Sequence, residues 1–461
     1  MTENIAPAAP TGAPRPGRRR VLSAAGLAGI ALRAAATLPA VPTLARAATA
    51  AERRSRLDNA VTIGSARLDA LAAEQHAVFN QGNVLRPFDV AAHGAQSDVR
   101  IHRITTWTRV PETGEDVKIS GLLAVPAGAR GRIPVVSWQH GTILAFDQVP
   151  SNLTRIAEPG YALRENVDSA ETLLNVHRFA AQGFAVIAAD YLGKGPYREG
   201  RPEAYAVKDA TTQTCMDMLD AGVAGLRDLG FEPDGLFLNG WSQGGLNTQW
   251  LAQALQRARR PVLASAAASP FNDLSEALRF WTGTDQHPAP TRAAYPAMPA
   301  WISLAIIIVL GSYEAYYRLD GLMRAAVRPA HHDFAATFWR DYGLDFDPAK
   351  PFPNGAQLLA EDMFQAFTAE PVSAFLRQLA ANRATYWEYE APMRLCYGLA
   401  DEAIHPVLAR RPLAGGGRHV EGVAVDRASH RVTFLANLYG TEEELGGRPD
   451  VLRWFRARLP G

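Results

Sequence analysis

Ser242 stands between two glycines in Gly240-Trp-Ser-Gln-Gly244, and a serine hydroxyl can act as a nucleophile when it is activated. An apolar run at 236–239 precedes this pentapeptide, and residues 246–255 follow it with helical spacing. A strand that turns directly into a helix holds such a serine on a strained turn, where the flanking glycines relieve the crowding. The context therefore predicts a nucleophile at Ser242, with a glycine-rich turn that carries no chemistry as the alternative.

The serine needs a general base, which is usually a histidine oriented by a carboxylate. In folds that use this turn, the acid and then the histidine follow the serine along the chain. Three of the 11 histidines, His405, His419 and His430, lie in the C-terminal part of the sequence. His430 comes directly after the last strand-like run, at 420–425, so we predict that it is the base.

The acid is expected in the loop that follows the strand-like run at 393–397. Asp401 lies where a carboxylate leaving the end of that strand could receive the imidazole N–H. We therefore favour Asp401 over its neighbour Glu402, and Asp426 is a more remote candidate. Any of these acids could instead cap a loop.

Acyl transfer also needs N–H donors for the oxyanion that develops in the transition state. The turn itself would supply the backbone N–H of Gln243. A second donor is expected from the loop after an earlier strand, at Gln139-His-Gly-Thr142, where we favour the N–H of Thr142 over that of Gly141. The alternative is a glycine turn with a structural histidine.

The elements that must position these residues follow an alternating order. Segments 99–110 and 117–125 flank a turn at 111–116 and predict a hairpin. Short apolar runs, each followed by a turn and a helical stretch, then predict parallel βαβ units and a mostly parallel sheet with helices on both faces. These runs are 133–138, 184–189, 235–239 and 262–268, and the pattern resumes at 393–397 and 420–425.

Between about 271 and 390 the alternation stops, and the sequence becomes helical, aromatic and interrupted by prolines. We therefore expect a helical cap at 271–390, inserted between late strands of an α/β core formed by 51–270 and 391–461. Residues 51–80 are expected to be a helical lead.

Several motifs together resemble the α/β-hydrolase superfamily, and more narrowly its secreted lipase and esterase branch. They are Ser120-Gly-Leu-Leu-Ala-Val-Pro126, Gln139-His-Gly141, Asp190-Tyr-Leu-Gly-Lys-Gly195, Gly240-Trp-Ser-Gln-Gly-Gly245 and Tyr397-Gly-Leu-Ala-Asp-Glu402. The resemblance covers roughly residues 99–461 without the insertion. It implies a lid at the position of the insertion, and the Asp190 motif is best interpreted as structural.

The N-terminus resembles a targeting signal. Arg18-Arg-Arg20 precedes a mildly apolar stretch at 21–32, and small residues follow at 45–50. Twin arginines in this context resemble the bacterial Tat export signal. We therefore expect residues 1–50 to be a signal peptide and the mature protein to be periplasmic or secreted, with a disordered tail or an uncleaved anchor as the alternatives.

Composition narrows the function classes. Six arginines against Glu3 give residues 1–47 a charge of +5, so the total of +1 leaves −4 for the rest, and no basic surface indicates nucleic-acid binding. Beyond the N-terminus no apolar run reaches the roughly 18 residues of a membrane span. Cys215 and Cys396 could form one disulfide or stay as free thiols.

The expected reaction is hydrolysis of a carboxylic ester with an apolar acyl or aryl part, through an acyl-enzyme on Ser242 and without a cofactor or metal. The expected partner is a small-molecule or lipid ester, because the aromatic cap suits an apolar pocket. The aromatic residues are Phe280, Trp281, Trp301, Tyr313, Tyr316, Tyr317, Phe334, Phe338, Trp339 and Tyr342. The main alternative is a prolyl or aminoacyl exopeptidase with the same triad; an acyltransferase and a non-catalytic binding protein are further ones.

Overall fold

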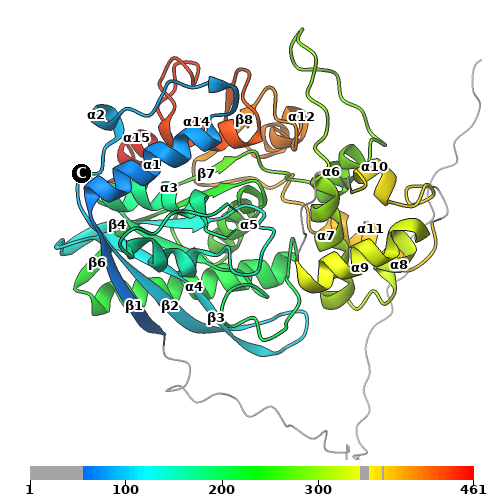
Figure 1. Ribbon diagram of the computed structural model, residues 1–461, viewed down its shortest axis with the longest axis horizontal. Helices are drawn as coiled ribbons and strands as arrows, with labels where there is room; N and C mark the ends of the chain where they lie inside the picture. The colour runs from blue at the N-terminus through cyan, green and yellow to red at the C-terminus, as the bar shows by residue number, and fades with distance from the viewer. Residues whose placement is uncertain (1–54, 166, 343–351, 366–367, 461) are drawn as a thin grey trace, which may run out of the picture. The chain divides into compact units, whose positions relative to one another are not determined.

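The computed structural model describes residues 55–165, 167–342, 352–365 and 368–460 (Figure 1). Within them the strands form one nine-stranded sheet in the order β1-β2-β3-β5-β4-β6-β7-β8-β9. The pairs β1/β2, β2/β3 and β3/β5 are antiparallel, and all later neighbours are parallel. The strands are β1 (Arg56–Ile63), β2 (Val99–Arg109), β3 (Asp116–Pro126), β4 (Gly131–Gln139), β5 (Ala185–Ala189), β6 (Phe231–Trp241), β7 (Ala264–Ala268), β8 (Met393–Gly398) and β9 (Val420–Val425).

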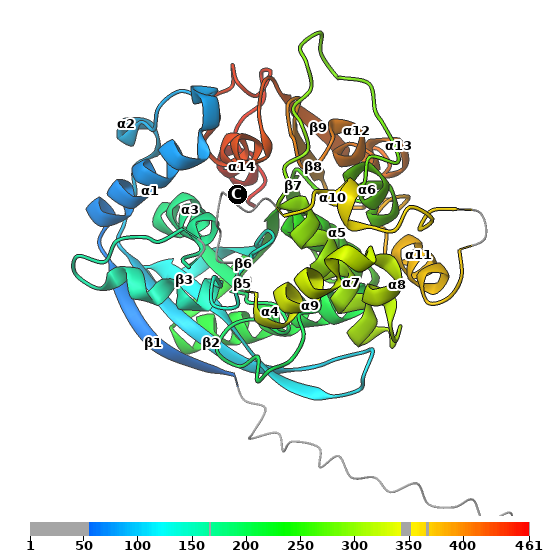
Figure 2. The same cartoon turned by 45° about the vertical axis from the view of Figure 1, so that its right-hand side comes forward.

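Helices cover both faces of the sheet (Figure 2). One apolar core lies under α1, α3, α14 and α15, and a second lies under α4 and α5 and continues into the cap. Strands β5 and β7 are buried along their whole length and consist mainly of small apolar residues, as expected for parallel strands covered on both sides. The predicted fold class is thus confirmed. The core helices are α1 (Ser65–Phe79), α2 (Val90–His93), α3 (Ala170–Phe179), α4 (Lys208–Asp228), α5 (Gln243–Arg257), α12 (Pro406–Ala409), α13 (Pro412–Gly415), α14 (His430–Tyr439) and α15 (Val451–Arg456).

Strand β1 corrects part of the expected helical lead. Residues 65–79 do form helix α1, but residues 56–63 pair antiparallel with β2. The register shifts between Asp58 and Val61, and Asn59 has a positive φ of 51°. This bulge puts Leu57 and Val61 against different cores, although their spacing of four is that of a helical turn.

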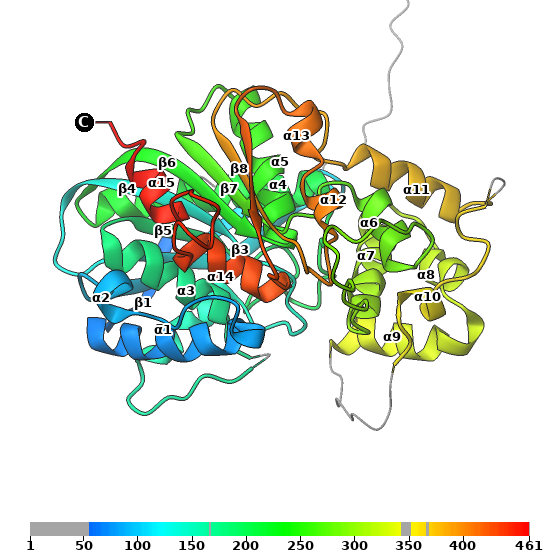
Figure 3. The same cartoon turned by 90° about the horizontal axis from the view of Figure 1, so that it is seen from above.

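Between β7 and β8 the chain forms a group of helices, the cap, which gathers on one side of the core (Figure 3). Its centre is α7, which contains the apolar run at 301–310 and is buried on nearly all sides. A helix that is apolar all round must be enclosed by other elements, and here the other cap helices and the core enclose it. The cap helices are α6 (Leu274–Trp281), α7 (Ile302–Tyr316), α8 (Leu322–Ala326), α9 (His332–Asp341), α10 (Gly355–Leu358) and α11 (Val372–Ala381).

Two other expectations concern cysteines and targeting. Cys215 on α4 and Cys396 on β8 are buried free thiols, and burial raises the pKa of each to about 12. The expected signal peptide lies outside the described residues and stays a prediction. No helix in the described ranges has the length and apolar character needed to cross a bilayer.

A buried ion pair fixes the C-terminal segment to the core. Arg178 on α3 lies 2.8 Å from Asp450, and their side chains are 4% and 1% exposed. Asp450 also caps α15 by accepting from the Arg453 N–H. Loss of the carboxylate would leave the guanidinium charge buried without its counterion.

We expect Asp450→Asn to lower the free energy of unfolding by about 3–5 kcal/mol, because breaking a buried pair strands a charge. Asparagine is also a good N-cap, so the substitution tests the charge rather than the cap. Urea unfolding measures the difference, with the exposed Asp426→Asn as control. Equal, small effects of both variants would contradict the proposed role of the pair.

Candidate active site

Ser242 joins β6 to α5 without a linker, since β6 ends at Trp241 and α5 begins at Gln243. Its φ of 56° and ψ of −118° lie in a region that non-glycine residues rarely occupy. Such strain persists only where the surroundings hold it, and it is typical of functional positions. The Ser242 N–H donates to the Ala268 carbonyl at 2.9 Å, which ties the turn to the end of β7.

The two glycines of the motif allow close backbone approaches. A Cβ on Gly240 would lie 2.2 Å from both the Gly244 carbonyl oxygen and Thr248 Oγ1. A Cβ on Gly244 would lie 1.9 Å from the carbonyl oxygen of Gln139, at the end of β4. The turn therefore packs directly against the loop that was predicted to supply the second oxyanion donor.

Asp401 and His430 lie together beside this turn. Nδ1 of His430 is 3.0 Å from both carboxylate oxygens of Asp401, and the two side chains are 5% and 1% exposed. The Trp241 ring, next to Ser242, lies 5.0 Å from the His430 ring, and its Nε1–H donates to the His430 carbonyl. With Nδ1–H donated to Asp401, the other ring nitrogen, Nε2, is left to accept a proton.

Asp401 is held in place by its own loop. One carboxylate oxygen accepts from the N–H groups of Ala403 and Ile404, at 3.1 and 2.8 Å. From the cap, Tyr295 donates to the Asp401 carbonyl, and Trp281 Nε1–H donates to the Ala403 carbonyl at 2.8 Å. The cap thus contacts the acid loop directly.

The competing acids have other contacts. Glu402 accepts from the backbone N–H of His430 at 3.0 Å, so it binds the main chain of the histidine rather than its ring. Asp426 is 75% exposed and lies 4.0 Å from Arg427.

The competing histidines also lie elsewhere. His405 caps α12 and packs against Tyr295, and His419 contacts Arg418 at the surface. Burial lowers the pKa of His405 to about 4.

The electrostatics of His430 suit a base that becomes charged during a reaction. Burial lowers the pKa of its imidazole, but the charge and hydrogen bond of Asp401, with the charge of Glu402, outweigh burial and raise the pKa above its usual value. An imidazolium ion is therefore stabilised at this position.

The candidate oxyanion donors lie on the turn and on the loop after β4. The first N–H groups of a helix have no acceptor within it, so that of Gln243, the first residue of α5, is available. The Gly141 N–H already donates to Glu171 Oε2 at 3.0 Å. Thr142, whose Oγ1 hydrogen-bonds Tyr205 at 2.6 Å, therefore remains the better candidate on this loop.

A buried histidine fixes the shape of the same loop. The His140 ring stacks on Tyr191 with centroids 4.0 Å apart, and the Tyr191 hydroxyl donates to the His140 carbonyl. Nδ1 of His140 donates to the Gly141 carbonyl at 2.8 Å. Burial lowers the pKa of His140 to about 4, so it is neutral near pH 7 and acts as a structural residue.

Glu171 is a functional candidate that the sequence did not single out. It lies in the first turn of α3, is 6% exposed, and binds the Gly141 N–H. Burial raises its pKa to about 7, although the Gly141 hydrogen bond and the charges of His430 and Arg431 oppose this. An acid in the first turn of a helix is ordinarily explained by the helix dipole, so no local signal connects Glu171 with the loop.

Some aromatic residues of the cap attach it to the core by hydrogen bonds, in addition to packing within the cap. Three tyrosine hydroxyls donate to the segment after β5: Tyr313 to the Ala206 carbonyl, Tyr316 to the Pro202 carbonyl and Tyr342 to Glu203 Oε2, at 2.6 to 3.0 Å. Only part of the aromatic set is thus left for an apolar pocket. Among the described residues, no group of three or more His, Cys, Asp or Glu side chains could hold a metal ion.

No family model matches the sequence, and no curated protein matches it either. Solved structures do resemble it. The rice cell wall degrading esterase LipA from Xanthomonas oryzae superposes with a TM-score of 0.63 at 19% identity, over 88% of this chain and 97% of the esterase.

Two further structures extend the comparison. A protein of Legionella pneumophila, described provisionally as a hydrolase, gives a TM-score of 0.66 at 17% identity, over 88% of this chain and 99% of its own. Candida antarctica lipase A gives 0.55 at 15% identity, over 77% and 79%. With the sheet order above, these similarities show that the chain has the α/β-hydrolase fold.

The buried carboxyl of Glu171 predicts a pH-dependent stability. Its pKa is about 7 in the folded protein against a usual 4.5, so the folded state binds more protons between these values and loses stability as pH rises through this range. The difference corresponds to roughly 3 kcal/mol.

We therefore expect the free energy of unfolding of Glu171→Gln, relative to that of wild type, to increase by roughly 3 kcal/mol as the pH is raised from about 4 to about 8.5. Urea unfolding across this range measures the effect, and the exposed Glu158→Gln is the matched control. A difference that does not change with pH would show that folding does not raise the pKa of Glu171.

Proposed function

We propose that this chain, which has the α/β-hydrolase fold, is a serine hydrolase that cleaves carboxylic esters with an apolar acyl or aryl part. One observation carries the proposal: the buried Asp401–His430 contact lies against Trp241, the residue next to Ser242 on its strained turn. A carboxylate, an imidazole and a serine in this order are the parts of an activated nucleophile.

In the proposed reaction, Ser242 Oγ attacks the ester carbonyl while Nε2 of His430 accepts its proton. Asp401 holds the Nδ1–H and stabilises the imidazolium that forms, which accords with the raised pKa of His430. His430 then returns the proton to the leaving alcohol. Water, deprotonated by the same histidine, hydrolyses the acyl-enzyme, and no metal or cofactor takes part.

The developing oxyanion would be bound by the N–H groups of Gln243 and Thr142. Both lie on backbone that is fixed before substrate arrives, the first by the start of α5 and the second by the contacts of His140 and Tyr205. Donors that need no rearrangement are the ones that stabilise a transition state most effectively.

An esterase is favoured over an exopeptidase because of the contacts that the carboxylates of the cap make. A peptidase of that type needs free carboxylates to bind a substrate amine. Of the four cap carboxylates considered for this role, Glu314 accepts from the Met323 N–H at 2.7 Å, Glu361 pairs with Arg328, and Glu370 pairs with Arg377, which leaves the exposed Asp362. The similarity to an esterase and a lipase supports the same choice.

Labelling by a fluorophosphonate probe tests the nucleophile. We expect wild type to be labelled and to hydrolyse p-nitrophenyl esters, and Ser242→Ala to lose both while keeping its unfolding free energy. Ser269→Ala, at the end of β7 beside the turn, is the matched control and should still be labelled. Labelling that persists in Ser242→Ala would show that another serine reacts.

A substrate panel separates the two functions. Turnover of p-nitrophenyl esters of increasing chain length is compared with that of prolyl and aminoacyl amides. Faster turnover of amides than of esters would contradict the proposed esterase function and favour the peptidase.

The dependence of kcat/KM on pH tests the Asp401–His430 pair. The acid limb reports the free imidazole, so in wild type it should lie above the range of an ordinary histidine. Asp401→Asn removes the charge that raises the pKa, so the limb should move to lower pH and kcat should fall by about 10⁴-fold.

Glu402→Gln serves as the control for Asp401→Asn. Its amide oxygen can still accept from the His430 N–H, so we expect a much smaller loss of rate. If Glu402→Gln were the more damaging substitution, Glu402 would replace Asp401 as the acid.

A further inference from the structure

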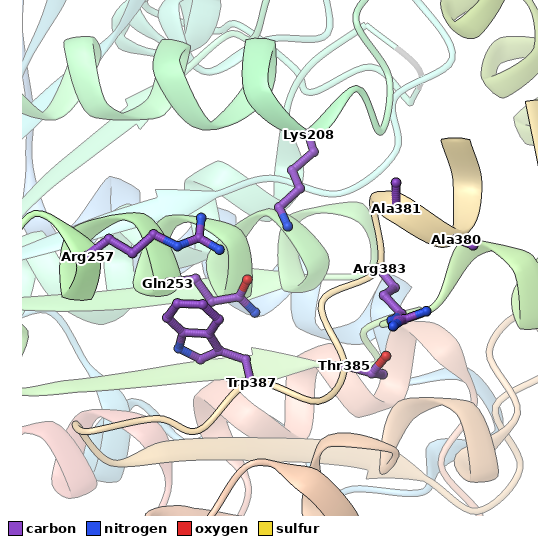
Figure 4. Close-up of a pocket in the computed structure, with 8 residues that line it drawn as sticks. All are labelled: Lys208, Gln253, Arg257, Ala380, Ala381, Arg383, Thr385 and Trp387. Atoms are coloured by element: carbon purple, nitrogen blue, oxygen red, sulfur yellow. The ribbon is translucent and has the colours of Figure 1, made fainter. Parts of the chain in front are cut away.

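A cavity of about 300 Å³ lies away from Ser242, between the start of α4, the end of α5 and the segment that leads from α11 to β8 (Figure 4). Gln253, in its wall, lies on α5 and is 11 residues beyond Ser242, which is roughly 16 Å along the helix axis. The cavity is therefore distinct from the candidate active site. It is lined by Lys208, Gln253, Arg257, Ala380, Ala381, Arg383, Thr385 and Trp387.

The charges around the cavity have one sign. Lys208, Arg257 and Arg383 line it from three elements, with the Arg383 guanidinium 5.5 Å from the centre of the Tyr386 ring, and none of the three forms an ion pair with any other residue in the described ranges. Burial lowers the pKa of Lys208, and the charges of Arg257 and Arg383 lower it further, whereas Asp209 opposes them. Arg257 and Arg383 thus each repel Lys208 in the absence of an anion.

One polar group in the wall of the cavity has no hydrogen-bond partner. Thr385 is 8% exposed, and its buried hydroxyl has no hydrogen-bond partner. A buried polar group without a partner costs stability, so a ligand that accepts a hydrogen bond there would be favoured. Gln253 is less available, because its amide N–H groups already donate to the Ala384 carbonyl and the Tyr389 hydroxyl.

The rest of the wall is apolar and stiff. The Arg257 guanidinium lies 4.5 Å from the centre of the Trp387 ring, and the Trp387 Nε1–H donates to Gln256. Ala380 and Ala381 complete this side. A volume of about 300 Å³ is at the lower end of sites for organic ligands and is larger than a bare ion needs.

We propose that this cavity binds a small molecule carrying a phosphate group, with the phosphate between Lys208, Arg257 and Arg383 and the organic part against Trp387. Three cations and a hydroxyl donor match several acceptor oxygens that share nearly two negative charges, which a single carboxylate does not provide. The ligand would bind apart from the ester reaction, so the proposal does not depend on the proposed function.

Calorimetry with phenyl phosphate, benzoate and inorganic phosphate tests the site in the full chain at low salt. We expect phenyl phosphate to bind with a Kd below about 1 mM, more tightly than inorganic phosphate or benzoate, and more weakly as salt is added. Equal affinity for benzoate and phenyl phosphate would contradict a preference for a phosphate group. Binding to phosphatidic acid vesicles without binding to phenyl phosphate would contradict a site for a small molecule.

Variants locate the binding. The double substitution Arg257→Gln/Arg383→Gln should weaken phenyl phosphate about tenfold or more, since charged hydrogen bonds are lost. Arg227→Gln, which removes one exposed positive charge at the other end of α4, is the control and should bind like wild type. Identical affinities in the double variant and the control would overturn the site.

Thr385→Val separates binding from folding. Its hydroxyl is buried without a partner, so its replacement should raise the unfolding free energy or leave it no lower, while it weakens the binding of phenyl phosphate several-fold. An unchanged affinity would show that the Thr385 hydroxyl does not bind the ligand. Ester hydrolysis should be unaffected in all these variants, so a failure here is distinct from a failure of the proposed esterase.

Discussion

The passage of β6 directly into α5 at Ser242 is the constraint on which the rest of the site depends. Ser242 has a positive φ and no linker on either side, so its position relative to the sheet is fixed. The glycines around it allow the end of β4 to come into van der Waals contact with the turn. The loop that carries Thr142 is thereby positioned by the same turn. Strain at one residue is maintained by packing over several strands.

Buried ionisable groups surround this turn, and burial and neighbouring charges shift their pKa values. Asp401 stabilises positive charge on His430, whereas burial keeps His140 neutral and favours the neutral form of Glu171 at low pH. A neutral Glu171 adds no charge of its own near the position where an oxyanion would develop.

Local patterns were sufficient for the alternation of strands and helices along the chain and for the turn at Ser242, because both depend on short-range spacing. The strand β1 was missed because a bulge at Asn59 gives its apolar residues a helical spacing. Spacing along the chain put Asp401 and Glu402 in the same loop, but only the three-dimensional path of that loop shows which of them meets the imidazole ring. Contacts such as that of Glu171 with Gly141 join distant segments and leave no periodic trace in the sequence.

The cap is attached at two separate places. Trp281 and Tyr295 hold it to the acid loop, and the hydroxyls of Tyr313, Tyr316 and Tyr342 hold it to the segment after β5. A rigid-body swing of the cap would break both sets of contacts and would displace the loop that carries Asp401. These contacts limit rigid-body movement of the cap, and they make the cap a structural support of the loop that carries Asp401.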